Sequence, residues 1–319
     1  MTPQPLPRDV FIDEIYHQAQ QDKDVYFITA DLGAQSLDRF RTELPNQFIH
    51  CGISEQTMID VACGMAQNGK KVYCYAMACF ATTRCYEQIK VALAVMDIPV
   101  TIVGVGVGYS YDNAGPTHYA IEDVSFMRCL GNIEIVTPVD TQTTRETARL
   151  TYNNPRLRYV RLDRKHLPDV YEQNDRSFIT QGFVETDPGN EYVIVTCGYM
   201  HQQARKVRTL LKNHGLDIGI IDAYRVKPLD LEIVKTMLAK YNHIITFEEH
   251  FLSGGLGSIV AEVCADTGLL RQIHRIAIKD SYYCDNGGRD YLHSLSGLDT
   301  ETVVNKILAI HTTQPLACR

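Results

Sequence analysis

A glutamate stands at the start of a mostly apolar helical stretch, in the segment "CGISEQTMIDVACGMAQNGKK" that covers residues 51–71. The spacing predicts a helix over 55–67, with Ser54 as its N-cap and Glu55 in its first turn. A carboxylate there complements the helix dipole, which is an ordinary structural role. The same carboxyl group could exchange a proton with a bound ligand, because general acid–base catalysis needs a carboxyl fixed in position. The residues alone leave both roles open.

A second candidate segment, "GVGVGYSYDNAGPTHYAIED" over 104–123, joins an apolar run to a helical one. Such a connection lies at the carboxyl edge of an open α/β sheet, where ligands bind. Tyr109, Tyr111 and Tyr119 surround His118 and could form the wall of a pocket. The segment has neither a G-x-G-x-x-G pattern nor a Walker A lysine, so it does not favour nucleotide binding. His118 is therefore either a structural loop residue or a proton-transfer group.

Apolar strands alternate with amphipathic helices in the first half of the chain. The expected strands cover 24–29, 71–77, 99–106, 133–138 and 158–162, and the expected helices cover 55–67, 82–95, 120–130 and 141–153. Continuous apolar strands separated by helices predict a parallel sheet with helices on both faces.

The same alternation restarts after a polar stretch. The expected strands there cover 192–198, 217–223, 243–250 and 273–278, and the expected helices cover 200–214, 230–239, 256–265 and 300–311. The predicted fold class is therefore α/β with two doubly wound domains. We place these domains at 1–166 and 191–319, joined by a linker at 167–190.

Composition limits the classes of function. The 319 residues are 45% hydrophobic and 22% charged, which is typical of a globular protein with roughly two domains. The net charge of −7 carries no basic block, so neither nucleic acid nor a membrane is expected as a partner. No secretory signal is evident, and we expect a cytoplasmic protein. The ten cysteines show no metal-ligand spacing, which predicts reduced thiols and no metal site.

Further motifs follow one another in a fixed order: "SLDRF", "FIHCGISEQTMIDVACGMAQNGK", "FATTRCYEQI", "AGPTHYAIEDVSFMRCLGNIEIVTPVD" and "YVRLDR". Together they resemble the pyrimidine-binding domain of thiamine-diphosphate enzymes of the transketolase and 1-deoxyxylulose-5-phosphate synthase group. The later motifs "IIDAYRVKPLD" and "ITFEEHFLSGGLG" are similar to the C-terminal domain of transketolases. The resemblance covers nearly the whole chain and implies these two domains.

The resemblance also implies roles for single residues. Glu55 matches the glutamate that bonds N1′ of the cofactor's aminopyrimidine and so promotes loss of the proton at thiazolium C2. Ile53 of the same motif is a candidate cofactor contact. Phe80 is the first candidate for the aromatic ring that stacks on the pyrimidine and Tyr86 the second, with core packing as the alternative. His118 in "GPTH" matches the histidine that faces the substrate and helps to move protons.

Arg39 and Arg164 match positions that hold a substrate phosphate, a task that suits guanidinium groups; a surface salt bridge is the alternative for each. Two departures from the family pattern concern the substrate. Ala114 replaces an acidic residue that reads a substrate hydroxyl, and "GVGVG" at 104–108 lacks a histidine. The usual pentose phosphates are therefore in doubt as substrates, whereas two-carbon transfer is not.

The chain contains no "GDG" motif, with which full-length relatives hold Mg²⁺ and the cofactor's diphosphate. We therefore expect the C-terminal subunit of a split transketolase. Its partner would be an N-terminal-half subunit that carries the diphosphate-binding domain, in an α2β2 complex. The expected reaction transfers a two-carbon ketol unit from a phosphorylated or otherwise anionic ketose to an aldehyde. The alternatives are a 2-oxoacid dehydrogenase β subunit, an enzyme like 1-deoxyxylulose-5-phosphate synthase, and a non-enzymatic scaffold.

Overall fold

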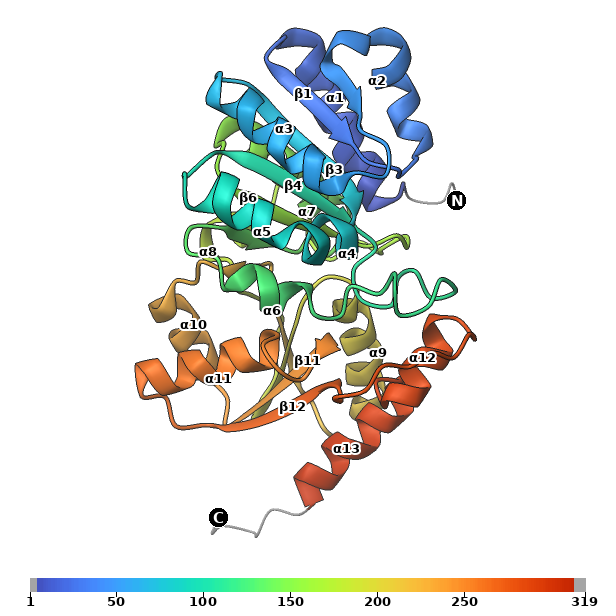
Figure 1. Cartoon of the computed structure of the whole chain (residues 1–319). Helices are drawn as coiled ribbons and strands as arrows, with labels where there is room; N and C mark the ends of the chain where they lie inside the picture. The colour runs from blue at the N-terminus through green and yellow to red at the C-terminus, as the bar shows by residue number, and fades with distance from the viewer. Residues whose placement is uncertain (1–4, 313–319) are drawn as a thin grey trace.

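Two sheets, one for each half of the chain, form the framework of the structure (Figure 1). The computed structural model describes residues 5–312. The first sheet has the strand order β10-β5-β6-β4-β3-β1-β2, and all its strands run parallel except the edge strand β10. Its strands are β1 (Val25–Thr29), β2 (Phe48–His50), β3 (Lys71–Met77), β4 (Val100–Val105), β5 (Glu134–Val136), β6 (Arg158–Leu162) and β10 (Arg225–Lys227). The predicted parallel sheet is confirmed.

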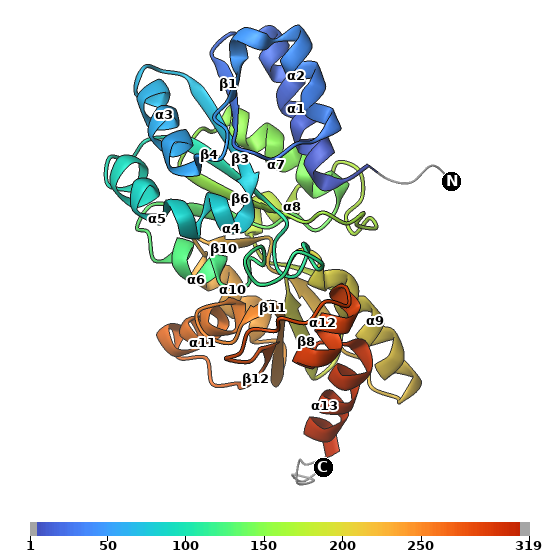
Figure 2. The same cartoon turned by 45° about the vertical axis from the view of Figure 1, so that its right-hand side comes forward.

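Helices cover both faces of this sheet (Figures 1 and 2). They are α1 (Pro7–Gln21), α2 (Asp38–Glu43), α3 (Glu55–Gln67), α4 (Ala78–Ala81), α5 (Tyr86–Gln88), α6 (Asp123–Arg128) and α7 (Thr141–Asn153), with the 3-10 turn η3 (Thr83–Cys85) and the π turn η4 (Ile89–Ala94) beside α5. The helices expected at 55–67 and 141–153 are confirmed. The helix expected at 82–95 is instead broken into short turns after Thr82, whose hydroxyl bonds back to the Ala78 carbonyl.

The second sheet has the order β12-β11-β8-β9-β7, with β7 antiparallel at its edge. Its strands are β7 (Val184–Asp187), β8 (Tyr192–Thr196), β9 (Gly219–Asp222), β11 (His243–Phe251) and β12 (Gln272–Ile278). The accompanying helices are α8 (Ser177–Gln181), α9 (Met200–Asn213), α10 (Leu231–Leu238), α11 (Leu256–Thr267), α12 (Arg289–Ser296) and α13 (Thr300–Thr312). The two-unit α/β fold class is therefore confirmed.

The two units are joined by more than a linker. Strand β10 follows β9 in the second half of the chain, yet it pairs with β5 of the first sheet. The segment 167–190 contains α8 and β7, and β7 pairs with β9. One apolar core cluster contains side chains of both sheets, for example Cys74 and Val195. The domain boundaries themselves stay a prediction.

Two further observations concern the cysteines and the lengths of the helices. The described cysteines, which are Cys51, Cys63, Cys74, Cys79, Cys85, Cys129, Cys197, Cys264 and Cys284, are free thiols, and Cys318 lies outside the described residues. No helix within residues 5–312 combines the length and the apolar character needed to span a membrane.

Asp222 is a buried carboxyl at the end of β9. Its Oδ2 accepts a hydrogen bond from the Tyr171 hydroxyl at 2.8 Å, whereas its Oδ1 has no partner among the described residues. Burial raises the pKa of Asp222 to about 8, and the nearby Asp140 adds to this rise. Near neutral pH the folded chain therefore keeps a proton on this group.

This carboxyl gives stability a defined pH dependence. Because its folded-state pKa lies above the ordinary value of 3.8, its stabilising contribution is complete below pH 3.8 and is lost as the pH rises toward 8. We expect Asp222→Asn to flatten the fall in the free energy of unfolding between pH 5 and pH 8 by more than about 1 kcal/mol. Urea unfolding at several pH values measures this, with the exposed Asp266→Asn as the control. An unchanged pH slope in Asp222→Asn would contradict the assignment.

Candidate active site

Side chains from four connections meet at the carboxyl edge of the first sheet. Glu55 begins α3 after β2, Phe80 lies in α4 directly after β3, and His118 lies in the loop after β4. Arg164 follows the end of β6. Because these strands run parallel, their carboxyl ends lie at one edge of the sheet, where ligands bind in folds of this kind.

Glu55 is buried, with only 3% of its surface exposed, although it is the first residue of α3. Ser54 occupies the N-cap position, but its side chain makes no cap bond; its hydroxyl donates instead to the Cys51 carbonyl at 2.5 Å. Arg84 Nη1 donates to Glu55 Oε2 at 2.7 Å. A carboxylate in a dry site needs such a partner, because an unpaired buried charge is costly. The Arg84 ion pair therefore holds the Glu55 carboxylate in one place.

Arg84 is a site residue that the sequence analysis missed. Its guanidinium lies 3.9 Å from the centre of the Phe80 ring while it holds Glu55. Arg84 belongs to η3 and comes four residues after Phe80, beyond the break at Thr82, and the fold brings the two side chains together. No helical spacing in the sequence marked it, because the helix predicted at 82–95 does not contain Phe80.

His118 extends this series of contacts toward the other end of the site. Its ring meets the edge of Phe80 with 5.3 Å between ring centroids, and it lies 6.3 Å from the Tyr111 ring. Its Nδ1 is 2.9 Å from the Thr117 hydroxyl. The guanidinium of Arg164 lies 4.0 Å from the centre of the Tyr111 ring. A continuous series of contacts thus runs from the buried acid to Arg164.

Arg8 lies with Arg164 at the cationic end of the series. Burial raises the pKa of Tyr111, and the charge of Arg164, whose guanidinium lies over the ring, and the charge of Arg8 oppose that rise. Within the described part of the chain, the Nε of Arg8 and the hydroxyls of Tyr75 and Tyr111 are buried without hydrogen-bond partners. A ligand with several acceptor oxygens would satisfy these donors. Arg8 lies in the first turn of α1, a helix that the periodicity did not predict.

Three predicted site residues lie outside this series of contacts. Arg39 on α2 forms an ion pair with Asp13 at 2.6 Å. Tyr86 packs against Phe126 with 6.2 Å between ring centroids. Ile53 is 76% exposed in the turn before α3. The structure does not bring these three side chains together with Arg164, and their roles stay predictions.

The glycine-rich run before His118 serves close packing. Gly106 has a φ of +86°, and a Cβ on it would overlap the Tyr111 ring. Only glycine therefore allows Tyr111 to fold back over the end of β4. This explains the glycine at this position without a phosphate-binding loop.

The two ends of the series suit different parts of a ligand. A buried carboxyl beside an aromatic ring suits a flat nitrogen heterocycle that shares a proton with it. Two guanidinium groups suit a phosphate or sulfonate. Within residues 5–312, no group of three or more His, Cys, Asp or Glu side chains is placed to hold a metal ion.

Two family models match the chain in succession. The pyrimidine binding domain of transketolase matches residues 7–170, and the transketolase C-terminal domain matches residues 182–303. Together these matches include every residue of the contact series described above.

Curated relatives and a solved structure agree with the family models. The chain is 34% identical over 302 residues to one of the subunits of an apulose-4-phosphate transketolase of Phocaeicola vulgatus, and the match covers 94% of this chain and 96% of that protein. It is 29% identical over 298 residues to a 6-deoxy-6-sulfo-D-fructose transketolase subunit of Clostridium sp. strain MSTE9, covering 93% and 92% of the two chains. A solved split-gene transketolase, described as an inactive β4 tetramer, superposes with a TM-score of 0.84 at 26% identity, covering 98% of this chain and 100% of that chain.

Loss of Arg84 should leave the Glu55 carboxylate buried without its partner. We expect Arg84→Met to lower the free energy of unfolding, and the double variant with Glu55→Gln to recover part of the loss. A double-mutant cycle measured by urea unfolding should give a coupling of about 1 to 2 kcal/mol. The exposed Arg39–Asp13 pair is the control and should couple by less than about 1 kcal/mol. Equal coupling energies in the two cycles would show that burial does not strengthen the ion pair between Glu55 and Arg84.

Proposed function

The chain belongs to the transketolase family, and from that premise we propose that it is one subunit of a split transketolase dependent on thiamine diphosphate. It supplies the pyrimidine-binding half of the active site together with the C-terminal domain. The proposed reaction transfers a two-carbon ketol unit from an anionic ketose to an aldehyde, in the cytoplasm. The observation that carries the proposal is the buried Glu55, which Arg84 joins to Phe80 at the carboxyl edge of the first sheet.

Dependence on thiamine diphosphate is implied by the family, and the residues at the acid end of the site fit its aminopyrimidine. Glu55 offers a buried carboxyl for a ring nitrogen, and Phe80 offers an aromatic surface close to it. Ile53 and Tyr86 are further candidate contacts from the same two segments. When bound, the cofactor supplies the electron sink that cleavage of a carbon–carbon bond requires.

Two side chains of this chain move protons in the proposed reaction. Glu55 holds a proton at N1′ of the pyrimidine, while Arg84 fixes the position of the carboxylate. His118 exchanges a proton with a substrate hydroxyl, and the Thr117 hydroxyl at 2.9 Å orients its ring. The two groups have separate tasks because they lie at opposite sides of Phe80 in the contact series.

Exposed apolar side chains on the turn before α3 and on the neighbouring helical segment support a partner subunit. Exposed apolar side chains lie on the turn before α3, which carries Ile53 (76% exposed), and on the helical segment that packs against this helix, which carries Val91 (56%), Val95 (74%) and Met96 (51%). The helical segment packs along the C-terminal half of α3, where Cys63 Sγ lies 3.1 Å from the Ala92 carbonyl and Gln67 Nε2 lies 4.0 Å from Met96 Sδ. Apolar groups exposed together are typical of protein interfaces. The proposed partner is an N-terminal-half transketolase subunit, which holds Mg²⁺ and the diphosphate in an α2β2 complex.

The cationic end of the site supports an anionic ketose as the donor. Arg8 and Arg164 both act on Tyr111, and the buried Nε of Arg8, which lies 3.6 Å from Asp9 Oδ1, has no hydrogen-bond partner among the described residues. The names of two relatives carry an anionic group on the sugar, a phosphate in one and a sulfonate in the other. We therefore assign the anionic group to these arginines rather than to Arg39, which is paired with Asp13.

Reconstitution tests the proposed function. The chain alone should bind thiamine diphosphate weakly even with Mg²⁺, because the partner holds the diphosphate. With the N-terminal-half subunit added, apulose 4-phosphate or 6-deoxy-6-sulfofructose should lose two carbons to an aldose phosphate, as followed by mass spectrometry. Tight cofactor binding by the isolated chain would contradict a split site. Turnover of pyruvate by the pair would instead favour the synthase or 2-oxoacid dehydrogenase alternatives.

A separate experiment tests whether the arginines at the cationic end recognise the charge of the donor. Arg8→Gln and Arg164→Gln each remove charge-assisted bonds worth about 1.5 to 3 kcal/mol, so the KM for an anionic donor should rise roughly tenfold to a hundredfold. A neutral donor of the same length should be little affected in steady-state kinetics. Arg39→Gln decides whether Arg39 shares the task, and its pairing with Asp13 predicts a change of less than about twofold. An equal rise in KM for charged and neutral donors would show that the arginines do not recognise the charge of the donor.

A further inference from the structure

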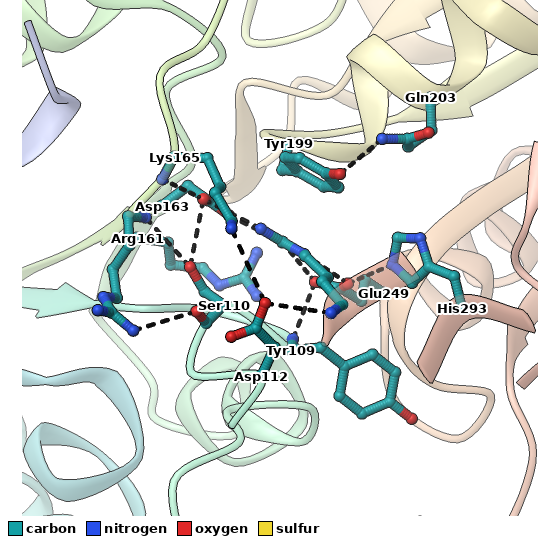
Figure 3. A network of polar contacts seen from close by, with 12 residues as sticks. Tyr109, Ser110, Asp112, Arg161, Asp163, Lys165, Tyr199, Gln203, Glu249 and His293 are labelled. Carbon is teal, nitrogen blue, oxygen red and sulfur yellow. Dashed lines mark hydrogen bonds and ion pairs between the residues drawn. The ribbon is translucent and has the colours of Figure 1, made fainter. Parts of the chain in front are cut away.

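Arg289 is a buried arginine at the start of α12, between the two units of the chain. Its Nη1 and Nη2 donate to the Asp163 carboxylate at 3.1 and 2.8 Å. Its Nε and Nη2 donate to the Glu249 carboxylate at 2.9 and 2.6 Å. Figure 3 shows Asp163 and Glu249 among the residues of this network. Asp163 directly follows β6 of the first sheet, whereas Glu249 lies on β11 of the second. One guanidinium therefore binds both units at once, in a geometry that lysine could not reproduce.

The same groups hold the loop between β4 and α6, residues 106–122. Glu249 Oε2 accepts a hydrogen bond from the Tyr109 amide at 3.0 Å. The Arg289 amide donates to Asp112 Oδ2 at 3.1 Å. In Figure 1 this loop lies at the junction of the two units, next to α12. The second unit thus anchors the loop at Tyr109 and at Asp112, just after its glycine-rich run.

Ser110 connects the network to Arg164. Its hydroxyl donates to Asp163 Oδ1 at 3.2 Å and accepts from the Arg164 amide at 3.1 Å. The Arg164 Nη1 also donates to the Ser110 carbonyl at 3.3 Å. Tyr111 lies between two anchored residues, Ser110 and Asp112, so the network holds its backbone in place.

Gly108 shows how closely the loop and the second unit approach. It has a φ of +61°, and a Cβ on it would overlap the Glu249 carboxylate. Burial alone would raise the pKa of Glu249, but the charges of Arg289 and His293 lower it to about 2. Glu249 is therefore a carboxylate at neutral pH and can accept all of these bonds. The close approach of Gly108 and the charges of Arg289 and His293 therefore act on the same carboxylate, Glu249.

We propose that Arg289 is a positioning residue, through which the C-terminal domain fixes the substrate-binding loop of the active site. The loop carries Tyr111 and His118, and the network ends on Arg164. The acid end of the site is held by another ion pair, between Glu55 and Arg84. This inference rests on the proposed function, because the substrate role of the loop belongs to that proposal. The C-terminal domain then sets donor affinity without touching the donor.

The variant Arg289→Lys tests this role in the complex with the partner subunit. Lysine keeps the charge but cannot bind two carboxylates in a forked geometry. Loss of one charge-assisted bond at the loop should raise the KM for the anionic donor about tenfold and lower kcat. Proton exchange at C2 of bound thiamine diphosphate, followed by NMR, should stay within about twofold of the wild-type rate, because the acid end is untouched.

Two further variants separate positioning from stability. Arg158→Lys alters a matched buried arginine, which is 1% exposed, binds Glu134 and lies at the opposite end of β6. It should lower Tm while leaving the KM for the anionic donor unchanged. Ser110→Ala keeps the buried charges and removes only the link between Asp163 and Arg164. It should raise the same KM with little change in Tm.

The possible results are distinct. If Arg289→Lys and Ser110→Ala leave the KM at the wild-type value while C2 exchange is normal, the positioning role is overturned and the proposed function stands. If Arg158→Lys raises the KM as much as Arg289→Lys does, the effect reflects general instability and the role is likewise overturned. If the wild-type complex shows no C2 exchange at all, the proposed function fails and the inference fails with it.

Discussion

Parallel strands all end at the same edge of a sheet, and the candidate site depends on this constraint. Residues that are far apart in the sequence follow β2, β3, β4 and β6, and they meet where those strands end. Helix α1 leads into β1, which places Arg8 of its first turn at the same edge. The edge acquires two unlike environments, a dry carboxyl at Glu55 and a cationic end at Arg164. A ligand that spans them must combine a proton-sharing ring with an anionic group.

Continuous apolar runs were enough to predict the main strands of both sheets and helix α3, because burial on both faces leaves a strong signal. The sequence could not predict that β10 completes the first sheet, since pairing between distant segments has no periodic signature. Glu55, Phe80 and His118 were found as members of motifs, and the structure places them in one contact series. Arg84 was missed because its importance lies in contacts that only the fold creates. The helix predicted at 120–130 begins only at Asp123, because its first residues belong to the loop of residues 106–122, whose contacts only the fold creates.

The two units share buried charges as well as apolar contacts. Successive residues of a strand point to opposite faces, and β11 uses this for two adjacent acids. Glu248 accepts from the Leu256 and Gly257 amides at 2.6 and 2.7 Å, at the start of α11. Glu249 turns toward Arg289 and the loop of the first unit. Because removal of one member of a buried charge group is strongly destabilising, such a network favours a single arrangement of the units. The motif that carries both acids thus serves the fold of its own unit and the site of the other.

Proton transfer at Glu55 is tested most directly by exchange of the C2 proton of thiamine diphosphate with deuterium in the reconstituted complex, followed by NMR. Glu55→Gln preserves the shape of the side chain but removes its ionisable group. The cofactor should still bind, and the exchange rate should fall by at least about a hundredfold, as the loss of a positioned acid–base group implies. Exchange at the wild-type rate in Glu55→Gln would contradict this role and leave Glu55 as a structural partner of Arg84.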